Sequence, residues 1–475
     1  MTFFASLALV FVLVIRPQEI WPVLGVLRLL DVFTGLCVVG VLVEIALGHQ
    51  KKLYTPQLPW VGLFVLSCYF ITALNLGVGR GLELGTNRAL IPSIFMLAVM
   101  YGARTLERLK GVVWLLLILG AFVSAVAVHQ GNQPPQCLER VTNEEGELAP
   151  DLDTADGRAC GLASDCRDGV RFDVEWACER VGLFKTFTTG RRVRWRGQLE
   201  DPNELSVFIG AIIPLLFALA MPGKHSSSMS SGSKTMLVML ALVALGLGIY
   251  AVILSQSRGG QLVLGTVFGI YFVSRYRVKG VVMAVVFALP VLLLGGRDAA
   301  EAEESASERI ELLYEGVSLF IRYPFRGVGV EQFADRVESS IHLTAHNSYL
   351  LTATEVGFVG FVCWSLILWT SFKIPLMVLK RPASAAQTAE LKSLAMALLV
   401  SLAGIAVGIF FLSFTYKQLL FVWFGLAGAM YRVVKQSDSS FEVKIGWKDV
   451  VGVVGGDLTI LALLYVYTRL KAGGA

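Results

Sequence analysis

The stretch IRYPFRGVGVEQFADRVESSIHLTAHNSYLLTATEVG, residues 321–357, decides how the rest of the chain is organised. It is the largest polar island in the C-terminal half of an apolar chain, and it runs directly into an apolar segment of membrane-spanning length. If the chain carries out chemistry, we expect its reactive groups here. The polar and conformationally special residues of this stretch are Arg322, Arg326, Gly327, Gly329, His342, His346, Asn347, Tyr349 and Glu355.

The composition excludes an ordinary soluble protein. Of the 475 residues, 55% are hydrophobic and 16% are charged, whereas a typical soluble domain has about 25% charged residues. Apolar runs of about 20 residues recur along the chain, and a helix of that length crosses a hydrocarbon core about 30 Å thick. Backbone groups in lipid must pair within their own segment, and the runs are too long for barrel strands. The sequence therefore predicts an all-α polytopic membrane protein.

The apolar runs predict about 12 transmembrane helices. A thirteenth candidate, residues 450–469, carries Asp457 near its middle. The first run, residues 2–15, has no basic segment before it and no small-residue cleavage site, so we interpret it as a retained span and not as a signal peptide. The twelve predicted spans cover residues 1–16, 28–47, 58–77, 87–103, 110–128, 203–222, 235–254, 259–275, 280–296, 347–372, 391–412 and 416–433.

The distribution of Lys and Arg among the loops orients the chain. Loops rich in these residues stay in the cytoplasm, whereas long loops are translocated largely regardless of their charge. The alternation is consistent along the chain and places the N-terminus in the cytoplasm. The loops predicted to be cytoplasmic carry Lys51 with Lys52, residues 104–110, Lys224 with Lys234, residues 275–279, Lys373 with Lys380 and Arg381, and Arg432 with Lys435.

This orientation divides the chain into five parts. Residues 1–128 hold the first five transmembrane helices, residues 201–296 hold helices six to nine, and residues 347–475 hold the C-terminal transmembrane helices. Two long outside segments separate them, residues 129–200 and residues 297–346.

Four cysteines cluster in the first outside segment. They include no CxxC pair, so their spacing does not fit a zinc site, and an even number of cysteines on an exported loop indicates two disulfides. Three pairings are open. The four cysteines are Cys137, Cys160, Cys166 and Cys178, whereas Cys37, Cys68 and Cys363 lie in predicted spans as small apolar residues.

The second outside segment is predicted to contain an amphipathic helix. Ser305 and Glu308 fit a capping box at its start, and Pro324 is expected to end it. We expect the helix to lie on the outer surface of the membrane. The apolar residues that recur at helical spacing are Ile310, Leu313, Tyr314, Val317, Phe320 and Ile321.

A basic stretch precedes the sixth predicted span and allows two interpretations. Arginine forks match phosphate oxygens, and a helix N-terminus adds N–H donors for an anion, so the stretch fits a clamp for a lipid-linked diphosphate. Alternatively, these arginines bind lipid headgroups, and Asp201-Pro202-Asn203-Glu204 is an ordinary helix start. The arginines are Arg191, Arg192, Arg194 and Arg196.

Arg258 lies in a turn, residues 255–260, so short that the neighbouring spans must form a tight hairpin. The residue is therefore expected at or slightly within the outer membrane interface. An arginine at mid-membrane costs roughly 2.5–3.5 kcal/mol, so one near that depth is usually paired or functional. The alternative is that Arg258 extends its guanidinium to the headgroups.

His346 precedes a long apolar span and is a candidate general base, since the unperturbed pKa of histidine lies near physiological pH. Equally, it fits a histidine that caps a helix at the interface. His342 is a substitute farther from the span, and Asn347 can cap the helix. Glu355 lies about two and a half turns deeper, where an unpaired carboxylate would be costly.

Taken in order and against the predicted spans, these motifs resemble the O-antigen ligase and polymerase superfamily of bacterial membrane proteins, which includes bacterial O-oligosaccharyltransferases. The resemblance covers roughly residues 185–430. Its motifs are Arg196-Gly197 with Asp201-Pro202-Asn203, then Ser257-Arg258-Gly259, then Tyr323-Pro324 with Gly327-Val328-Gly329 and Phe333, and finally His346-Asn347-Ser348-Tyr349 with Glu355-Val356-Gly357.

The resemblance implies a C-type glycosyltransferase architecture in the bacterial inner (cytoplasmic) membrane, with the active site and both outside segments in the periplasm. Members take a glycan from undecaprenyl diphosphate and transfer it to an acceptor hydroxyl, such as that of the lipid A core in lipopolysaccharide biosynthesis. The implied partners are this donor, a glycan acceptor and the lipid bilayer, with no nucleic acid, no metal and no nucleotide cofactor.

The resemblance also implies roles for individual residues. By position, His346 would activate the acceptor. The residues that would hold the donor diphosphate are Arg196, Arg258 and either Arg322 or Arg326. Candidate supporting residues are Asn203, Asn347, Tyr349, Glu355 and His342. Arg191 and Arg194 are further candidates, although the resemblance does not explain the purpose of their charge or of that of Arg192. The cysteine-containing loop is longer than the family pattern leads us to expect.

Ligation to lipid A core is the function we favour from the sequence, because the amphipathic segment at 308–322 offers a docking surface near the membrane. A polymerase of lipid-linked repeat units and a protein O-oligosaccharyltransferase remain alternatives. A lipid-linked glycan transporter is a further alternative, but it would need charged residues around the membrane midplane and broken helices in both halves. Here the polar clusters lie at the outer edge, which favours an outward-facing active site.

Overall fold

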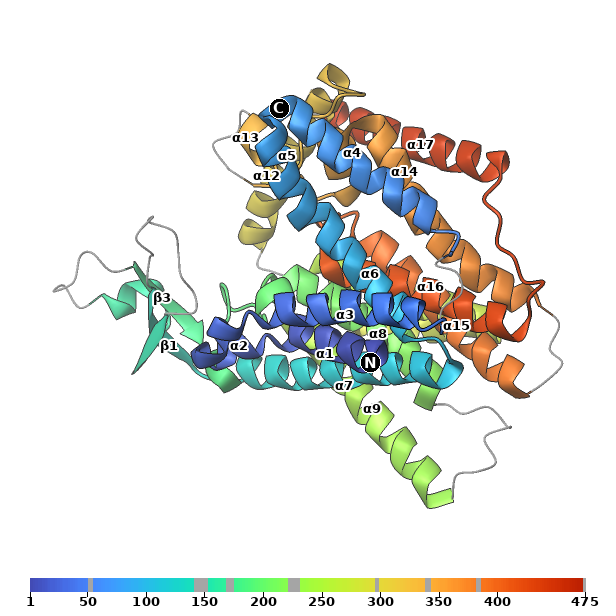
Figure 1. The fold of residues 1–475 in the computed structure, drawn as a ribbon. Coiled ribbons are helices and arrows are strands. Elements are labelled where there is room, and N and C mark those ends of the chain that lie inside the picture. Colours follow the sequence, from blue (N-terminus) through green and yellow to red (C-terminus); the bar gives the residue numbers. More distant parts are fainter. Residues whose placement is uncertain are drawn as a thin grey trace.

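The computed structural model of the protein describes residues 1–49, 54–140, 153–167, 175–220, 231–294, 299–337, 343–381 and 386–472. The chain is predominantly helical, and one small β-sheet projects from an end of the helical body (Figure 1). Predicted His342 lies outside the described residues.

The described residues of the N-terminal third of the chain form seven α-helices, besides the 3₁₀ helix Pro22–Leu27 and the π-helical segment Thr86–Leu90. Helices α1 and α6 pack against each other, and α3 contacts both. The helices are α1 (Thr2–Ile15), α2 (Pro17–Ile20), α3 (Leu29–Ala46), α4 (Leu58–Leu76), α5 (Val78–Gly85), α6 (Ile91–Gly102) and α7 (Leu106–Gly131).

The remaining helices follow the β-sheet in the chain. They are α8 (Pro202–Ala220), α9 (Ser231–Leu254), α10 (Arg258–Tyr276), α11 (Val278–Leu294), α12 (Ala299–Arg322), α13 (Phe333–Arg336), α14 (Ser348–Lys380), α15 (Ala386–Gly408), α16 (Gln418–Ser437) and α17 (Trp447–Ala472). The centre of the packing is formed where α8 contacts α15, α10 contacts both, and α14 contacts α4, α15 and α16.

Nine helices among the described residues are long and apolar enough to cross a membrane. The all-α polytopic class predicted from the sequence is therefore confirmed. Two further apolar helices are shorter, Thr2–Ile15 (α1) and Val278–Leu289 within α11. The predicted spans 259–275 and 416–433 coincide with α10 and α16, and the thirteenth candidate coincides with α17.

The first outside segment contains a three-stranded antiparallel sheet that the sequence did not indicate. Its strands are β1 (Pro135–Arg140), β2 (Thr154–Ala159) and β3 (Glu175–Arg180), in the order β2-β1-β3. Disulfides join Cys137 to Cys166 and Cys160 to Cys178. The structure thus contains one of the three pairings that the sequence left open.

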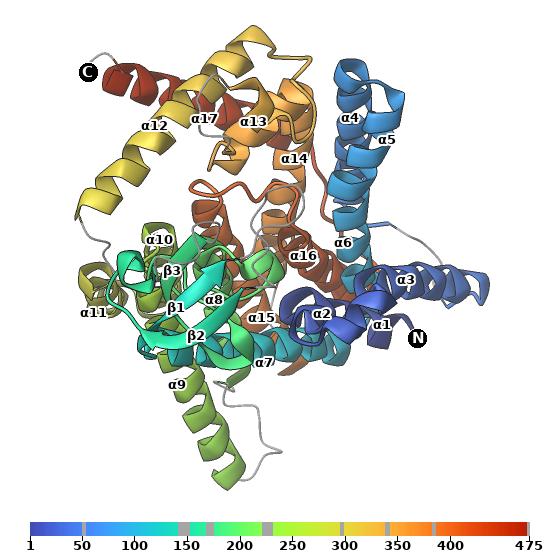
Figure 2. The same cartoon turned by 90° about the vertical axis from the view of Figure 1, so that its left-hand side faces the viewer.

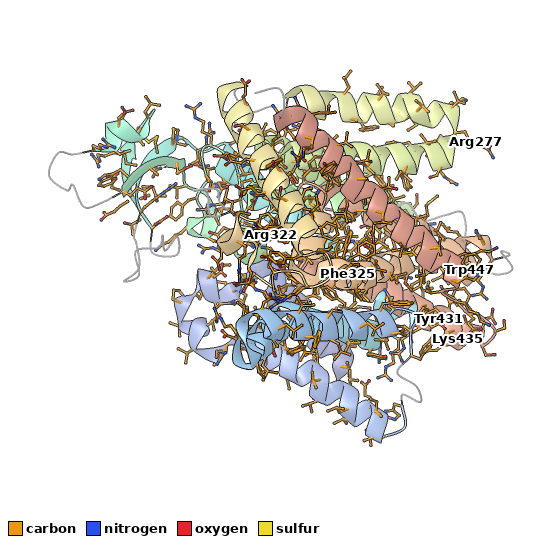
Figure 3. All side chains as sticks on the ribbon, turned by 90° about the horizontal axis from the view of Figure 1, so that it is seen from above. Arg277, Arg322, Phe325, Tyr431, Lys435 and Trp447 are labelled. Carbon is orange, nitrogen blue, oxygen red and sulfur yellow. A yellow bond between two sulfur atoms is a disulfide. The ribbon has the colours of Figure 1, made fainter. Side chains whose placement is uncertain are left out.

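The loops predicted to be cytoplasmic and the first outside segment can be located on the helical body. Figure 3 shows Arg277, Lys435 and Trp447 toward the end remote from the sheet. Both cations belong to loops that the distribution of Lys and Arg assigns to the cytoplasm, and the disulfide-bonded sheet belongs to a segment assigned to the outside. The two assignments therefore fall at opposite ends of the fold.

One predicted helix boundary is wrong. The capping box at Ser305 and Glu308 predicts a helix start at 305, but α12 already begins at Ala299. Residues 299–304 are alanines and glutamates, which are strong helix formers, and acidic residues are favourable near a helix N-terminus. Local propensity therefore extends the helix past the predicted cap. Its end at Arg322, shortly before Pro324, agrees with the sequence.

Helix α14 is interrupted inside the membrane-length segment at Gly357, whose φ is 70° and ψ is 173°. Such a break leaves backbone groups without helical partners, and in a membrane these must find partners in the protein. The glycine-containing loop 323–330 provides them. Its hydrogen bonds run from Val328 N to Thr354 O (2.9 Å), from Gly329 N to Glu355 O (3.0 Å), and from Phe358 N to Pro324 O (2.7 Å).

Seen from the sheet end, α12 runs from the group formed by α13, α14 and α17 toward the α10–α11 pair (Figure 2). It packs on α14 and on α17. This course carries the helix across the sheet end of the fold, next to the cavity described below.

Candidate active site

A cavity of about 700 Å³ lies between α10, α12, α17 and the loop 409–417. Its polar end is lined by Asn203, Gln256, Arg258, Arg309 and His346. The remainder is lined mainly by apolar side chains, namely Leu262, Ala306, Ile310, Leu313, Ala345, Phe410, Phe411, Leu463, Leu464 and Tyr467. The cavity thus offers a cationic end and an apolar end to one ligand.

Arg258 is presented to the cavity by the turn between α9 and α10. Ser257 caps α10, because its Oγ accepts a hydrogen bond from Gly260 N at 3.0 Å. Gln256 adopts a left-handed conformation with φ of 50°, which reverses the chain within three residues. Arg258 is the first residue of α10 and is exposed. The tight hairpin predicted from the sequence is present.

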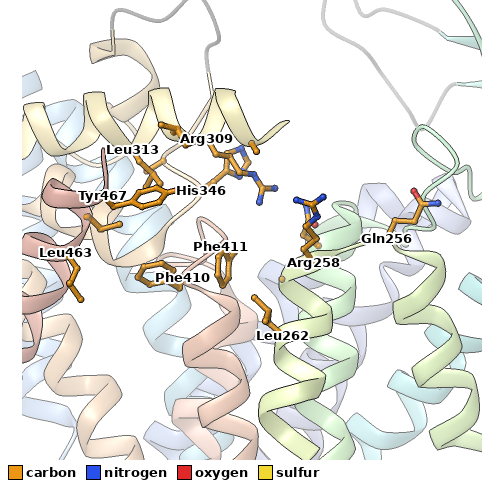
Figure 4. Close-up of a pocket in the computed structure, with 16 residues that line it drawn as sticks. Gln256, Arg258, Leu262, Arg309, Leu313, His346, Phe410, Phe411, Leu463 and Tyr467 are labelled. Carbon is orange, nitrogen blue, oxygen red and sulfur yellow. The ribbon is translucent and has the colours of Figure 1, made fainter. Parts of the chain in front are cut away.

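Arg309 enters the cavity from α12, and sequence reasoning missed it. Figure 4 shows Arg309 and Arg258 on opposite sides of the cavity with their guanidinium groups directed toward each other, and His346 beside Arg309. The available signal was a single cation directly after an acidic run and directly before the apolar periodicity of the predicted helix. Two guanidinium groups that converge on one space form a strong site for an anion with several oxygens.

His346 lies in the loop before α14 and takes a left-handed conformation with φ of 46°. Burial lowers the pKa of His346 below its usual value, and the nearby charge of Arg309 lowers it further, while Asp201 opposes the shift. The imidazole is therefore neutral at neutral pH. A neutral ring nitrogen at the wall of a cavity can accept a proton from a bound hydroxyl group.

Asn347, Ser348 and Tyr349 hold the start of α14 against the loop 409–417. Asn347 Oδ1 accepts a hydrogen bond from Leu350 N at 2.9 Å, which confirms the predicted helix cap. The three residues also bond to the loop and to the end of α15. Those bonds run from Asn347 Nδ2 to Phe410 O (3.0 Å), from Ser348 Oγ to Leu412 O (2.6 Å) and from Tyr349 Oη to Ala406 O (3.0 Å). The loop carries Phe410 and Phe411 into the cavity wall.

Glu355 is 2% exposed and has two partners. Its Oε2 accepts a hydrogen bond from Tyr416 Oη at 2.8 Å, and its Oε1 accepts one from Phe333 N at 3.3 Å. The carboxyl group that would be costly without partners is thus bonded on both oxygens. Glu355 ties α14 to α13 and to the loop 409–417, and it lies outside the lining of the cavity.

Arg196 and Arg194 lie in a different recess, of about 100 Å³. Arg196 Nη2 donates to Phe184 O at 2.7 Å and to Lys185 O at 3.1 Å, and Arg194 forms an ion pair with Glu200 at 3.1 Å. The structure therefore does not bring these two arginines to the cavity that holds Arg258 and His346.

Arg322, Arg326 and Arg191 also lie away from the lining of this cavity. Arg322 is the last residue of α12 (Figure 3), and Arg326 Nη2 donates to Leu74 O of α4 at 3.2 Å. Arg191 is exposed at the tip of a turn and has φ of 69°. Of the four arginines predicted to bind the diphosphate, only Arg258 lines the cavity.

Asn203 contributes to the polar end from the first turn of α8. Its Oδ1 accepts a hydrogen bond from Arg192 Nη2 at 2.9 Å, and its backbone N donates to Asp201 Oδ1 at 2.6 Å. Glu204, one residue further, pairs with Lys417 at 3.0 Å. The α8 start is therefore tied to the arginine-containing segment and to the loop that carries Phe410.

The sulfur atoms of Cys137, Cys160 and Cys166 lie within 4.8 Å of one another. All three are engaged in disulfides. Cysteine binds a metal as a thiolate. The sulfur atoms of these three cysteines are bonded in two disulfides, so they are not available as metal ligands.

Comparison with known proteins finds a family match for a region that supplies part of the cavity lining. Residues 240–365 match a family model described as O-antigen ligase, and no curated protein matches the chain. The matched region is narrower than the one expected from the sequence, but it includes Arg258, Arg309 and His346. The match supports a glycosyltransferase of ligase or polymerase type that uses lipid-linked glycans in a membrane. Residues 240–365 are therefore similar to the O-antigen ligase and polymerase superfamily, which confirms the resemblance predicted from the sequence.

Proposed function

We propose that the protein transfers a glycan from undecaprenyl diphosphate to a hydroxyl group of lipid A core, with Arg258 and Arg309 binding the diphosphate and His346 accepting the proton of the acceptor. The proposal places this chemistry on the periplasmic face of the inner membrane. The observation that carries it is the convergence of two arginines and a neutral histidine on the polar end of a cavity whose other end is apolar.

The proposed step is a displacement at the anomeric carbon of the donor sugar. The acceptor oxygen forms a bond to the anomeric carbon of the donor sugar, while the bond between that carbon and the diphosphate oxygen breaks. The electron pair of the broken bond stays on the diphosphate, and the acceptor proton moves to a ring nitrogen of His346. Arg258 and Arg309 stabilise the charge that develops on the leaving group. Such stabilisation of developing charge is usually the largest single contribution to the rate enhancement.

The two ends of the cavity suit the two ends of the donor. The diphosphate fits between the guanidinium groups, and the isoprenoid chain fits along Leu262, Leu463 and Tyr467. Both Leu463 and Tyr467 belong to α17, which is apolar and of membrane-spanning length. The isoprenoid chain would therefore pass from the cavity into lipid without leaving an apolar environment.

Lipid A core is the proposed acceptor because of α12. One face of this helix lines the cavity at Ala306, Arg309 and Leu313, and its other face is exposed at Ser307 and Glu311. A hydroxyl and a carboxylate can hydrogen-bond sugar hydroxyl groups. A bulky acceptor that carries sugars close to the membrane surface could lie along this face and reach His346.

The proposal is tested by following the products of the purified full-length chain. The protein is given an undecaprenyl-diphosphate glycan in two reactions, one with lipid A core and one without added acceptor. Glycan attached to lipid A core supports the proposed function. Lengthened donor glycan in the reaction without acceptor indicates a polymerase instead, and the absence of transfer in both reactions rejects a transferase with these substrates.

A further inference from the structure

The segment that joins the disulfide-bonded sheet to α8 contains a tight turn, residues 189–192. Thr189 N donates to Arg192 O at 2.9 Å, and Arg192 N donates to Thr189 O at 3.0 Å. The two central residues, Gly190 and Arg191, have φ of 53° and 69°. Positive φ at both positions is typical of the type I′ turn of β-hairpins. The turn places Arg192 at a fixed position directly after its tip.

The turn is anchored to the sheet through Glu179 of β3, which is 4% exposed. Glu179 Oε2 accepts a hydrogen bond from Thr188 Oγ1 at 2.5 Å, and Oε1 accepts one from Gly190 N at 2.9 Å. Glu179 directly follows Cys178, which is bonded to Cys160. The position of the turn is therefore fixed by the disulfide-bonded sheet.

On its other side, Arg192 bonds to two elements that form the polar end of the cavity. Its Nε donates to Ser255 O at 2.9 Å, and its Nη2 donates to Asn203 Oδ1 at 2.9 Å. Ser255 opens the turn that ends at Arg258, and its carbonyl follows the last residue of α9. A cation is favourable at this helix end, because the last carbonyl groups of a helix lack partners within the helix.

We propose that Arg192 is a positioning residue for Arg258. The guanidinium fork holds the turn at 255–257 against the first turn of α8, and this contact fixes the direction in which α10 presents Arg258. The inference rests on the proposed function, and it names the residue that sets the geometry of diphosphate binding. It also connects the covalent structure of the sheet to the cavity.

The fork geometry is what makes arginine suitable at this position. One planar group donates to two acceptors in different elements, and lysine, a flexible point charge, cannot reproduce both directions equally well. Neighbouring arginines cannot substitute for Arg192. Arg194 Nε donates to Phe187 O at 2.9 Å and its Nη1 bonds to Glu200, while Arg191 is exposed at the tip of the turn.

The test measures binding of undecaprenyl diphosphate and of undecaprenyl monophosphate to the purified full-length protein. For Arg192→Gln we expect the affinity for the diphosphate to fall about tenfold, equivalent to about 1.4 kcal/mol, with a much smaller change for the monophosphate. Arg192→Lys should restore part of the preference. The matched control is Arg158→Gln, which removes an arginine paired with Asp156 in the same outside segment and should leave the preference unchanged.

A double-mutant cycle then tests whether Arg192 acts through Arg258. In the Arg258→Gln background, Arg192→Gln should have no further effect on the ratio of the two affinities, because coupled residues are not additive. An unchanged ratio in Arg192→Gln, or fully additive effects in the double mutant, would overturn the inference. If Arg192→Gln does not fold, Arg192→Lys provides the same comparison and must reduce the preference for diphosphate.

The outcomes for the unmodified protein separate this inference from the proposed function. A wild-type protein that shows neither transfer nor preference for the diphosphate rejects both. A wild-type protein that transfers the glycan and prefers the diphosphate, combined with an Arg192→Gln variant of equal preference, rejects only the positioning role.

Discussion

Replacement of Gly327 by alanine should destabilise the fold at the break in α14. The backbone at Gly327 has φ of +61°, and an added Cβ would lie 2.4 Å from Glu355 O and 2.8 Å from Gly357 N. Both contacts are to backbone atoms, which cannot move aside as a flexible side chain does. The loop 323–330 must therefore shift away from α14.

The expected magnitude follows from what this shift breaks. A left-handed conformation costs a residue with a Cβ about 1–2 kcal/mol. The shift also breaks the hydrogen bonds from Val328 N to Thr354 O and from Gly329 N to Glu355 O. Each buried group left without a partner costs about 1–3 kcal/mol. The sum indicates a loss of at least about 3 kcal/mol in the free energy of unfolding.

The assay is reversible unfolding of the purified protein in mixed micelles by increasing the fraction of a denaturing detergent. The control is Gly452→Ala in α17, where an added Cβ meets no atom within 4 Å and φ is not left-handed. This control should unfold as the wild type does. A Gly327→Ala protein as stable as the control would refute the interlocking of the loop with the break in α14.

The other predictions concern the cavity and the disulfides. Arg258→Ala should reduce the rate of transfer by about 10²–10³-fold, as measured by product formation, with unchanged membrane insertion; full activity would remove Arg258 from diphosphate binding. The proposed base His346 would act in its neutral form, and its pKa is lowered, so activity should fall only at a pH below the usual range of histidine. Arg309→Gln removes a charge that lowers this pKa and should move the loss of activity to higher pH. A pH profile that does not move in Arg309→Gln would show that Arg309 does not act on His346. Replacement of Cys160 and Cys178 by Ser should cost about 2–4 kcal/mol of stability, whereas mass mapping that finds both thiols free in the wild type would contradict the bridge.

The helices could be predicted from the sequence because their signal is local. A run of about 20 apolar residues specifies a membrane-length helix without reference to the rest of the fold. The β-sheet has no comparable signal. Strand β2 reads TADGRA, which lacks alternation and contains Thr154 as its one β-former, and all six of its residues are exposed. Its place is set by pairing with β1 and by the disulfides, which are contacts between distant parts of the sequence.

A site residue could be predicted where its side chain suited the chemistry and its position relative to a predicted transmembrane span was clear. Arg258 and His346 had both, and the structure places both at the cavity. Arg309 had the chemistry but sat in a charged helix whose course over the cavity depends on tertiary packing. Arg196 had a strong local pattern, yet the fold directs it to the recess near Lys185.

Glu355 also shows that contacts between distant parts of the sequence could not be predicted. Its depth in an apolar segment predicts a partner, but the partner, Tyr416, lies 61 residues away in the chain. The motifs around Gly327 and Gly357 likewise become intelligible only when the loop and the broken helix are seen together. These residues hold the segments next to the cavity in place but do not line it. Their residue types alone do not distinguish them from residues that line the cavity.

The central claim is most directly tested by single-turnover transfer with purified wild type, His346→Ala and the neighbouring control Thr344→Ala, an exposed position. Each protein receives the undecaprenyl-diphosphate glycan and lipid A core at saturating concentrations. General-base catalysis typically contributes about 10²–10⁴-fold, so the rate constant of His346→Ala should fall by that factor while donor affinity and the control remain unchanged. A His346→Ala protein that transfers glycan at the wild-type rate would contradict the account.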